Sequence, residues 1–368
     1  MKINSFTLFL GLLLIILSCK PSSSKIEIHP NSENLNKTHD NAIGYLNSVD
    51  STNQVIRELM NRDLSSVIPS DSNSSIILGR VNEIEVGSNR IFILDSEQFK
   101  VFVFDYQGQL IDVIGGQGKG PSEFRDLRSI TVIDDKALYL SDAVSGISKF
   151  KFNGSTYVYE RDVMQDVGFD KISSTNSNLY ASKTYYQRNA NDSLKTITEY
   201  NINNLEPKKK FGNAYIDENI DTIFSLSESM FYITDTVLIF TKFFDPYIYG
   251  YDLKTSDLKW STFIENLEFP KFIEKPGSFV IDEKYIDEIP SDFISSINQI
   301  NESHILVQYA SKVYKQKYSN SIIKSYLINI NDGSGRYVNT QLPLFKHIDE
   351  RYSLTYSDFP FQLIKMYE

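Results

Sequence analysis

Short runs of alternating apolar and polar residues, separated by turn residues, occupy most of the chain. From 90 to 154 the same plan appears twice: an apolar run ending in Asp, a polar turn, and a second run ending in Asp or Asn at the next turn. Asp95 recurs as Asp142, 47 residues later, and Asp105 recurs as Asn153, 48 residues later. Alternation with a period of two predicts strands, and a repeat of this length with several strands is typical of a propeller blade. The pattern therefore predicts an all-β protein, a β-propeller with four-stranded blades.

Strand-like runs can be assigned to five such units, of which the first two are the clearest. We place strands at 84–86, 91–94, 101–104 and 110–114; at 129–133, 137–140, 147–152 and 157–163; at 178–183 and 196–202; at 229–233, 237–242, 247–253 and 259–264; and at 294–300, 304–309 and 322–330. An acidic insert with several prolines, from 265 to 290, separates the fourth unit from the fifth. The remainder, from 337 to 368, supplies too few strands for a sixth blade.

This shortage predicts how the ring closes. Propellers often complete one blade with strands from both termini, which leaves no free sheet edge. We expect the segment from Val67 to Val81 to pair with the segment around 352–366. The shared blade brings the count to six, with five or seven blades left open as alternatives.

The first 20 residues are not expected to belong to the fold. After a charged start, an apolar run of 12 residues extends from Phe6 to Leu17. This run is too short to span a bilayer and has the length of the apolar region of a secretory signal. Ser18 before Cys19 resembles the lipobox of bacterial lipoproteins, in which cleavage leaves the cysteine as a lipid-bearing N-terminus. An ordinary signal peptide or a membrane anchor is the alternative.

Cys19 is the only cysteine in the chain, so no intramolecular disulfide is available. The lipobox resemblance implies that it carries a diacylglycerol and an N-acyl chain, and more than one acyl chain gives stable anchoring to a membrane. We assign 1–18 to the lipoprotein signal peptide, 19–50 to a flexible tether rich in Ser and Asn, 51–64 to a short amphipathic helix and 65–368 to the propeller.

The net charge and the composition bear on the class of partner and on the secondary structure. The chain has 37 basic and 47 acidic side chains, for a net charge of −10. Nucleic acid is therefore not an expected partner, because its phosphates require a basic face. The 23 Tyr and 24 Phe residues favour strands.

The stretch IGGQGKGPSEF from Ile114 to Phe124, followed by SITVIDDKALYLSD and ISKFKFNG, resembles the NHL-type repeat. More closely, it resembles the six-bladed β-propeller lipoproteins of Gram-negative bacteria, whose lead-in is similar to VIPSDSNSSIILGRVNEIEV here. The similarity extends from about residue 65 to 158, roughly a quarter of the chain. It implies six blades and a place in the cell envelope, with the lipid holding the protein to the outer membrane on its periplasmic side. It implies no particular activity.

The glycine-rich loop from Gly115 to Gly120 is the most prominent chemical motif. A phosphate-binding loop needs GxxxxGK[ST] and a following helix, whereas Lys119 is followed by Gly120 and then by a strand-like run. We interpret the loop as a connection between blades. Asp95 and Asp142 are interpreted in the same way, as turn residues that bond their own backbone, with channel carboxylates as the alternative.

Metal and catalytic signatures are weak. Only His304 and His347 lie in the expected fold, and a catalytic zinc usually has about three protein ligands with His prominent. No metal ligands and no catalytic residues are assigned, and no cofactor is expected. Calcium stays open because it needs only oxygen ligands.

The turns between the second and third strands of each blade are expected to gather at one mouth of the propeller. They are rich in Tyr, Phe and Arg, which give a large contact area with a polar group at the end. The candidate binding face consists of Tyr185, Tyr186, Arg188, Phe244, Tyr247 and Tyr314 from these turns, together with Arg125 and Arg128 from the connection to the next blade, which can approach either this mouth or the opposite one. The alternative is that these are ordinary loop residues packed on neighbouring blades.

The sequence therefore favours a lipid-anchored, extracytoplasmic β-propeller that binds a protein, peptide or sugar and has no evident catalytic activity. Two alternatives stay open. One is a metal-dependent hydrolase or lyase of the lactonase-like propeller type, which would use channel carboxylates. The other is a structural subunit of an envelope complex.

Overall fold

The computed structural model describes residues 63–68, 78–165, 168–183, 195–213, 229–243, 245–270, 272–275, 278–281, 283–313, 322–348, 353–358 and 361–367. These residues form six four-stranded antiparallel sheets. The expected signal peptide, tether and most of the expected helix, from 1 to 62, lie outside the described residues. The last two residues of that expected helix, Asp63 and Leu64, are instead part of a strand.

Each sheet is one blade, and five blades are continuous in the chain. Blade one contains β2 (Val81–Val86), β3 (Arg90–Asp95), β4 (Lys100–Asp105) and β5 (Leu110–Gly115). Blade two contains β6 (Leu127–Ile133), β7 (Ala137–Asp142), β8 (Gly146–Phe152) and β9 (Tyr157–Gln165). Blade three contains β10 (Phe169–Ser174), β11 (Asn178–Lys183), β12 (Lys195–Asn201) and β13 (Pro207–Asn213).

Blade four contains β14 (Ser229–Ile233), β15 (Val237–Lys242), β16 (Tyr247–Asp252) and β17 (Leu258–Phe263). Blade five contains β20 (Ser291–Asn301), β21 (His304–Lys312), β22 (Ile322–Asn329) and β23 (Gly335–Val338). Blade six contains β24 (His347–Ile348), β25 (Ser353–Asp358), β26 (Phe361–Tyr367) and the N-terminal strand β1 (Asp63–Ile68).

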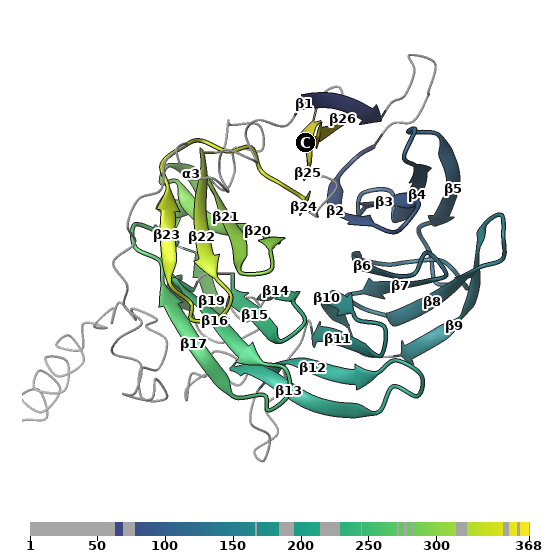
Figure 1. Cartoon of the computed structure of the whole chain (residues 1–368), viewed down its shortest axis with the longest axis horizontal. Helices are drawn as coiled ribbons and strands as arrows, with labels where there is room; N and C mark the ends of the chain where they lie inside the picture. The colour runs from purple at the N-terminus through teal and green to yellow at the C-terminus, as the bar shows by residue number, and fades with distance from the viewer. Residues whose placement is uncertain are drawn as a thin grey trace, which may run out of the picture.

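The blades form a closed ring around a central axis (Figure 1). The first strand of each blade contacts the first strand of the next, in the order β2, β6, β10, β14, β20, β24 and back to β2. Successive strands of each blade then lead outward from the axis. The predicted all-β propeller with four-stranded blades is confirmed.

Both termini complete the last blade, as the sequence predicts. β1 pairs antiparallel with β26, and Asp63 lies opposite Tyr367. The expected boundary is wrong, however, because Val81 starts β2 in blade one. Val81 and Ile84 are buried against blade one, and Ile84 pairs with Ile93 of β3, so packing assigns this run to the first blade.

Apolar side chains fill the spaces between adjacent blades. Between blades four and five, the fully buried Trp260 donates a hydrogen bond of 2.8 Å from Nε1 to the carbonyl of Ile330. A Cβ at Gly250 would lie 2.2 Å from the indole ring, and one at Gly333 would lie 2.7 Å from it. The only tryptophan of the chain therefore fits between two blades because both neighbouring positions lack a side chain.

The turn residues that repeat along the sequence act as expected. Asp105, Asn153, Asp252 and Asp332 each accept hydrogen bonds from backbone N–H groups two to four residues further on. Their side chains close the turns between the third and fourth strands of blades one, two, four and five.

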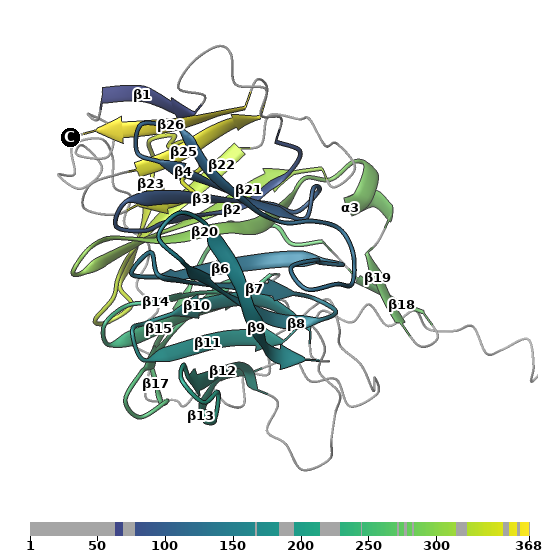
Figure 2. The ribbon, with the colours of Figure 1, turned by 90° about the vertical axis from the view of Figure 1, so that its right-hand side faces the viewer.

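The insert between blades four and five contains a hairpin, β18 (Phe272–Lys275) with β19 (Ser278–Ile281), and the short helix α3 (Glu283–Asp287). All three lie on one side of the ring (Figure 2). Within the described part of the chain, none of the helices has the length and apolar character that crossing a bilayer requires.

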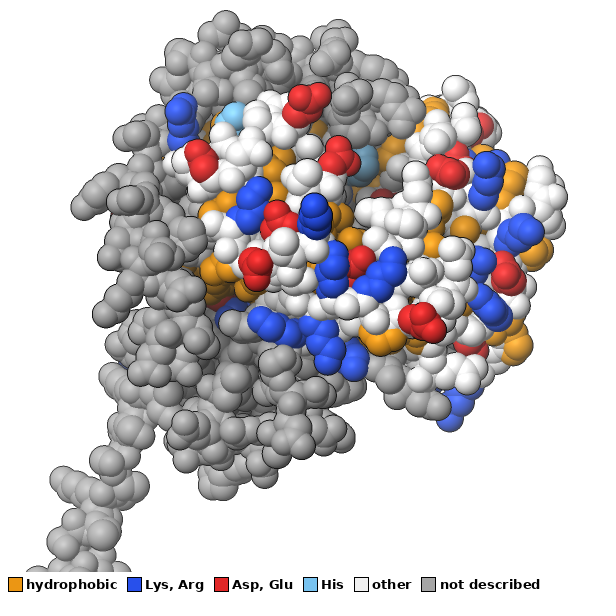
Figure 3. Space-filling model, turned by 60° about the horizontal axis from the view of Figure 1, so that its bottom comes forward, with side chains coloured by type: hydrophobic (Ala, Val, Ile, Leu, Met, Phe, Trp, Pro, Cys, Tyr) orange, Lys and Arg blue, Asp and Glu red, His pale blue; other side chains and the backbone are white. Residues whose placement is uncertain are grey.

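The outer edge of blade three is strongly basic. β13 begins with Pro207 and continues with Lys208, Lys209 and Lys210. Basic side chains gather on the edge of the ring where β13 lies (Figure 3). Proline and lysine on an edge strand discourage pairing with another chain, so this run protects the blade from edge-to-edge association.

Candidate functional site

The ring has two differently built mouths. The first mouth is formed by the turns between the first and second strands of each blade, including β2–β3, β6–β7 and β10–β11. The second mouth is formed by the turns between the second and third strands and by the connections between blades, because these segments lie at the other end of the same strands. The strongest candidate site lies at the first mouth.

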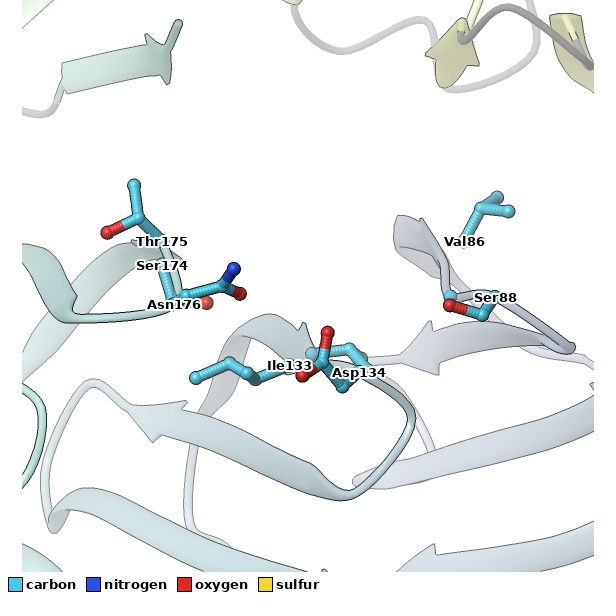
Figure 4. A pocket seen from close by; sticks show the side chains of 9 residues that line it. Val86, Ser88, Ile133, Asp134, Ser174, Thr175 and Asn176 are labelled. Carbon is cyan, nitrogen blue, oxygen red and sulfur yellow. The ribbon is translucent and has the colours of Figure 1, made fainter. Parts of the chain in front are cut away.

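A pocket of about 270 Å³ opens at the first mouth between blades one, two and three (Figure 4). Each blade contributes three consecutive residues from the end of its first strand and the turn that follows. They are Val86, Gly87 and Ser88; Val132, Ile133 and Asp134; and Ser174, Thr175 and Asn176. Asp134 is the only charged residue in this lining, so one carboxylate among hydroxyl and amide groups sets the character of the pocket.

The β6–β7 turn gives two adjacent aspartates different roles. Asp134 and Asp135 have φ angles of 49° and 52°, which is the left-handed pair that a two-residue type I′ hairpin turn requires. Asp135 is buried and accepts hydrogen bonds from the backbone N–H groups of Ser88 (3.1 Å) and Asn89 (2.6 Å). A Cβ at Gly87 would lie 1.6 Å from Oδ1 of Asp135, so this close approach requires glycine. The bonds of Asp135 fix the first turn of blade one against that of blade two.

Asp134 is exposed at the tip of the same turn. Figure 4 shows its carboxylate directed into the space between Asn176 on one side and Val86 and Ser88 on the other. On the floor of this region, Oγ1 of Thr131 and Oγ of Ser174 lie 2.8 Å apart and share a hydrogen bond between blades two and three.

Below the pocket, side chains join the inner strands of the same three blades. The carboxylate of Glu83 on β2 accepts hydrogen bonds from the hydroxyl of Ser129 (2.7 Å) and the backbone N–H of Ile130 (3.1 Å) on β6. It also pairs with the ammonium of Lys171 on β10. Ser129 in turn accepts a hydrogen bond of 3.2 Å from the backbone N–H of Ile172. We call Glu83, Ser129 and Lys171 the channel brace.

Two ionisable groups in or next to the channel brace have shifted pKa values. Burial raises the pKa of Glu85, two residues after Glu83 on β2, to about 8. Burial and then the nearby ammonium of Lys346 lower the pKa of Lys171 to about 8. Such shifts are frequent at functional sites. Because the brace also links three blades, it holds the pocket above it in a fixed shape.

The sequence interpretation missed these residues. It treated VNEIEV as a lead-in and made no assignment for Lys171. The available signal was the pair Glu83 and Glu85, charged residues at alternate positions of a short strand that also contains Val81, Ile84 and Val86. In an ordinary strand this pattern indicates a solvent-facing side, whereas in the innermost strand of a propeller it faces the channel.

Asp95 and Asp142 lie at the second mouth and have structural roles, as interpreted from the sequence. Asp95 is buried and accepts from the backbone N–H groups of Gly79, Arg80, Glu97 and Gln98. Asp142 is equally buried and accepts from those of Arg125, Asp126, Val144 and Ser145. Each carboxylate joins a turn of its own blade to the segment that leads into that blade. In the described part of the chain, no three His, Cys, Asp or Glu side chains form a group that could hold a metal ion.

The glycine-rich loop is hydrogen-bonded by a carboxylate of the same segment. The carboxylate of Glu123 accepts hydrogen bonds from the N–H groups of Lys119 (2.9 Å) and Gly120 (2.7 Å). A Cβ at Gly118 would lie 2.0 Å from the same carboxylate. The next regular element is the strand β6 rather than a helix. The loop is therefore a connection between blades whose N–H groups are satisfied within the chain.

The candidate binding face predicted from the sequence is described only in part. Arg125 belongs to the β5–β6 connection at the second mouth, where its Nε donates to the hydroxyl of Ser145 (3.1 Å). Arg128 lies at the start of β6 and pairs with Asp126 (2.7 Å). Tyr247 starts β16 and its ring lies 5.2 Å from that of Phe263. The remaining predicted residues lie outside the described part of the chain: Tyr185, Tyr186, Arg188, Phe244 and Tyr314. Arg125 is thus placed beside the β7–β8 turn, on the mouth where the sequence interpretation gathered the other residues.

Comparisons with known proteins agree with this architecture. The model of the DUF5128 family, described as a 6-bladed beta-propeller, matches residues 33–342. A solved protein of Bacteroides fragilis that is inferred to be exported has a TM-score of 0.57 and 16% identity over 83% of this chain and 94% of its own. A member of the duf4221 family from Bacteroides vulgatus has a TM-score of 0.54 and 10% identity over 84% of this chain and 96% of its own. Among the curated proteins no sequence is similar enough to match.

Proposed function

We propose a ligand-binding function for this chain, which belongs to the DUF5128 family of 6-bladed beta-propellers. The ligand is a small polar molecule, or the polar end of a larger one, of the sugar or peptide class. It occupies the pocket of about 270 Å³ at the first mouth. The observation that carries this proposal is a polar-lined pocket whose three walls come from three different blades and are fixed to one another by side-chain bonds.

Three features support the assignment to this pocket. Its volume is close to the lower end of the range for small-molecule sites, which is about 300 Å³. Asp135 fixes the turns of blades one and two, and Ser174 bonds blade three to blade two. A site fixed in this way loses little conformational freedom when a ligand binds, and affinity benefits from this preorganisation.

We also propose that the protein is lipid-anchored through Cys19 and acts outside the cytoplasm, on the periplasmic side of the outer membrane. Support comes from the 12-residue apolar run followed by Ser18 and the single cysteine. It also comes from the exported relative with the same fold. A Cys19→Ala variant is expected to lose incorporated fatty acid and to leave the membrane fraction, and retention of both in the variant would contradict the anchor.

A thermal-shift panel of monosaccharides, disaccharides and short peptides tests the binding function on the full chain. A molecule that binds only the native state raises the midpoint of unfolding, so weak binders register at high concentration. Binding should be lost in Asn176→Trp, because the exposed Asn176 lines the pocket and an indole there fills it. Arg125→Ala at the second mouth is the matched control and should bind normally. Loss of binding in the Arg125 variant alone would move the site to the second mouth.

A further inference from the structure

We infer that the ligand of this pocket carries a primary ammonium group and that the carboxylate of Asp134 is its anchor. The inference rests on the proposed binding function and names the chemistry of the ligand at the same pocket. Three features support it: the negative charge in the pocket, the bonds already made by the neighbouring charged residues, and the hydrogen-bond acceptors at the rim.

Asp134 places one negative charge in a pocket with no basic residue in its lining. Its carboxylate is directed into the pocket (Figure 4), and no hydrogen bond or ion pair holds it among the residues that the structure describes. The adjacent Asp135 shows the contrast, because its two oxygens are occupied by N–H groups of Ser88 and Asn89. Of the two neighbouring acids, only Asp134 is available to a ligand.

Two basic residues lie near this turn. Lys136 is exposed and directly follows Asp135, outside the pocket lining, whereas Arg90, at the start of β3, is bonded to other groups. The guanidinium of Arg90 lies over the ring of Phe152, 3.9 Å from its centroid. Its Nη1 donates to the carbonyl of Asp135 and to the hydroxyl of Tyr157, both at 3.4 Å. Arg90 therefore contacts the backbone of Asp135 and the neighbouring aromatic rings. It does not neutralise the carboxylate of Asp134 at the tip of the turn.

Other exposed acids lie on the same side of the ring. Asp235 is in the β14–β15 turn and Glu302 is in the β20–β21 turn, and both are exposed. Lys136, in the same turn as Asp134, is exposed as well, so the charges at this mouth are of both signs. The attraction for a cation therefore comes from the carboxylate of Asp134 inside the pocket rather than from the charge of the whole mouth.

The rim also has enough acceptors for an ammonium group, which has three N–H donors. Besides the carboxylate of Asp134, the side chain of Asn176 offers an amide oxygen, and the hydroxyl of Thr175, which accepts from the backbone N–H of Asn178 (3.2 Å), has a second lone pair. Charge-assisted hydrogen bonds are roughly twice as strong as neutral ones. An ammonium group therefore uses this rim better than a neutral hydroxyl group does. The N-terminus of a short peptide and an amino sugar both present such a group.

Two matched probe pairs test the inference on the full chain by titration calorimetry at pH 6.5. One pair is alanyl-alanine amide and its N-acetylated form; the α-amino group, with a pKa of about 7.7–8.0, is charged at this pH. The other pair is glucosamine and glucose. The probe with the amine should bind about two- to five-fold more tightly than its neutral partner, as expected for an ion pair whose carboxylate is exposed. The preference should decrease at high salt.

Asp134→Asn removes the charge and keeps a residue that tolerates the left-handed turn. We expect the preference for the amine to fall to about one-fold with the midpoint of unfolding unchanged. Asp235→Asn, outside the pocket, is the matched control and should keep the preference. The peptide pair and the sugar pair separately identify which source of ammonium is recognised.

Two results would overturn the inference in distinguishable ways. If a neutral sugar binds and Asn176→Trp abolishes that binding, but no amine preference is found, the binding function stands and the ammonium assignment fails. If neither probe pair nor any member of the panel binds, both fail. An amine preference that persists in Asp134→Asn also contradicts the assignment.

Discussion

Replacing Asp142 by Asn tests whether the repeated aspartates of this propeller are structural. Asp142 is 2% exposed and accepts four backbone hydrogen bonds of 2.7–2.9 Å. An amide has one oxygen with two lone pairs, so Asn keeps at most two of these bonds and turns its NH₂ group toward the other donors. Hydrogen bonds to a charged group contribute about 1.5–3 kcal/mol each. Loss of two predicts a decrease of at least about 3 kcal/mol in the free energy of unfolding.

Thermal and urea unfolding followed by circular dichroism measure this decrease. The entropy of unfolding is about 2.1 cal/mol/K per residue, or about 0.6 kcal/mol/K for the roughly 300 residues of the propeller. A loss of about 3 kcal/mol therefore predicts a decrease of about 5 °C in the midpoint. Asp105→Asn is the matched control. Asp105 is in a solvent-facing turn and accepts only from Gln107 and Gln109, so its replacement should cost about 1 kcal/mol or less.

The pH dependence provides a second test of the same reasoning. Burial raises the pKa of Asp142, but the four backbone N–H groups outweigh this effect and lower the pKa below its usual value. The stabilisation is therefore complete above the unfolded-state pKa of about 3.9. It is lost as the pH falls through the folded-state pKa, so the gap between wild type and Asp142→Asn should be constant from pH 5 to 7 and shrink below pH 4. Equal stability of the Asp142 and Asp105 variants would refute the structural role, and so would a calcium-dependent increase confined to wild type.

Three further perturbations address the channel, the core and the closure of the ring. Because burial raises the pKa of Glu85 to about 8, the folded state retains a proton that the unfolded state loses from about pH 4.3 upward. Wild type should lose stability from pH 5 to 8 relative to Glu85→Gln in midpoint measurements, and parallel profiles would contradict this. Gly250→Ala should lower the free energy of unfolding by about 3 kcal/mol or more, measured in urea, because a Cβ there meets the Trp260 ring. Overpacking of this kind costs about 1–3 kcal/mol or more. An unchanged midpoint would argue against the observed packing. Deleting β1 (Asp63–Ile68) should expose the edge of β26 and promote oligomers in light scattering, whereas a stable monomer would contradict closure by both termini.

The sequence predicted the strands best where both faces of a strand are packed. β15 and β21 are almost entirely buried between blades, so their apolar runs are unambiguous. β10 and β13 were missed. β13 is an outer edge strand whose Lys-rich run serves to block pairing, and only Phe211 from this strand is buried in the core, which is too little to give an alternating pattern. β10 places Lys171 in the channel, which interrupts the expected pattern with a charge.

The candidate site was harder to predict than the fold. Glu83, Ser129 and Lys171 are far apart in the sequence and meet only because successive blades place their first strands around one axis. The pocket depends in the same way on three short turns whose Ser, Thr, Asn and Asp residues are typical of any hairpin. Composition identifies such turns but does not show which of them face a common space. For that reason the sequence interpretation favoured the more conspicuous aromatic and arginine-rich turns of the second mouth.

Hydrogen–deuterium exchange with a ligand from the binding panel tests the central claim most directly, because it locates the site without any substitution. If the ligand occupies the pocket at the first mouth, exchange should slow at 86–88, 132–134 and 174–176, while the β7–β8 turn and the β5–β6 connection remain unchanged. Protection of 123–128 and 142–146, with none in the three turns of the first mouth, would contradict the account and place binding at the second mouth.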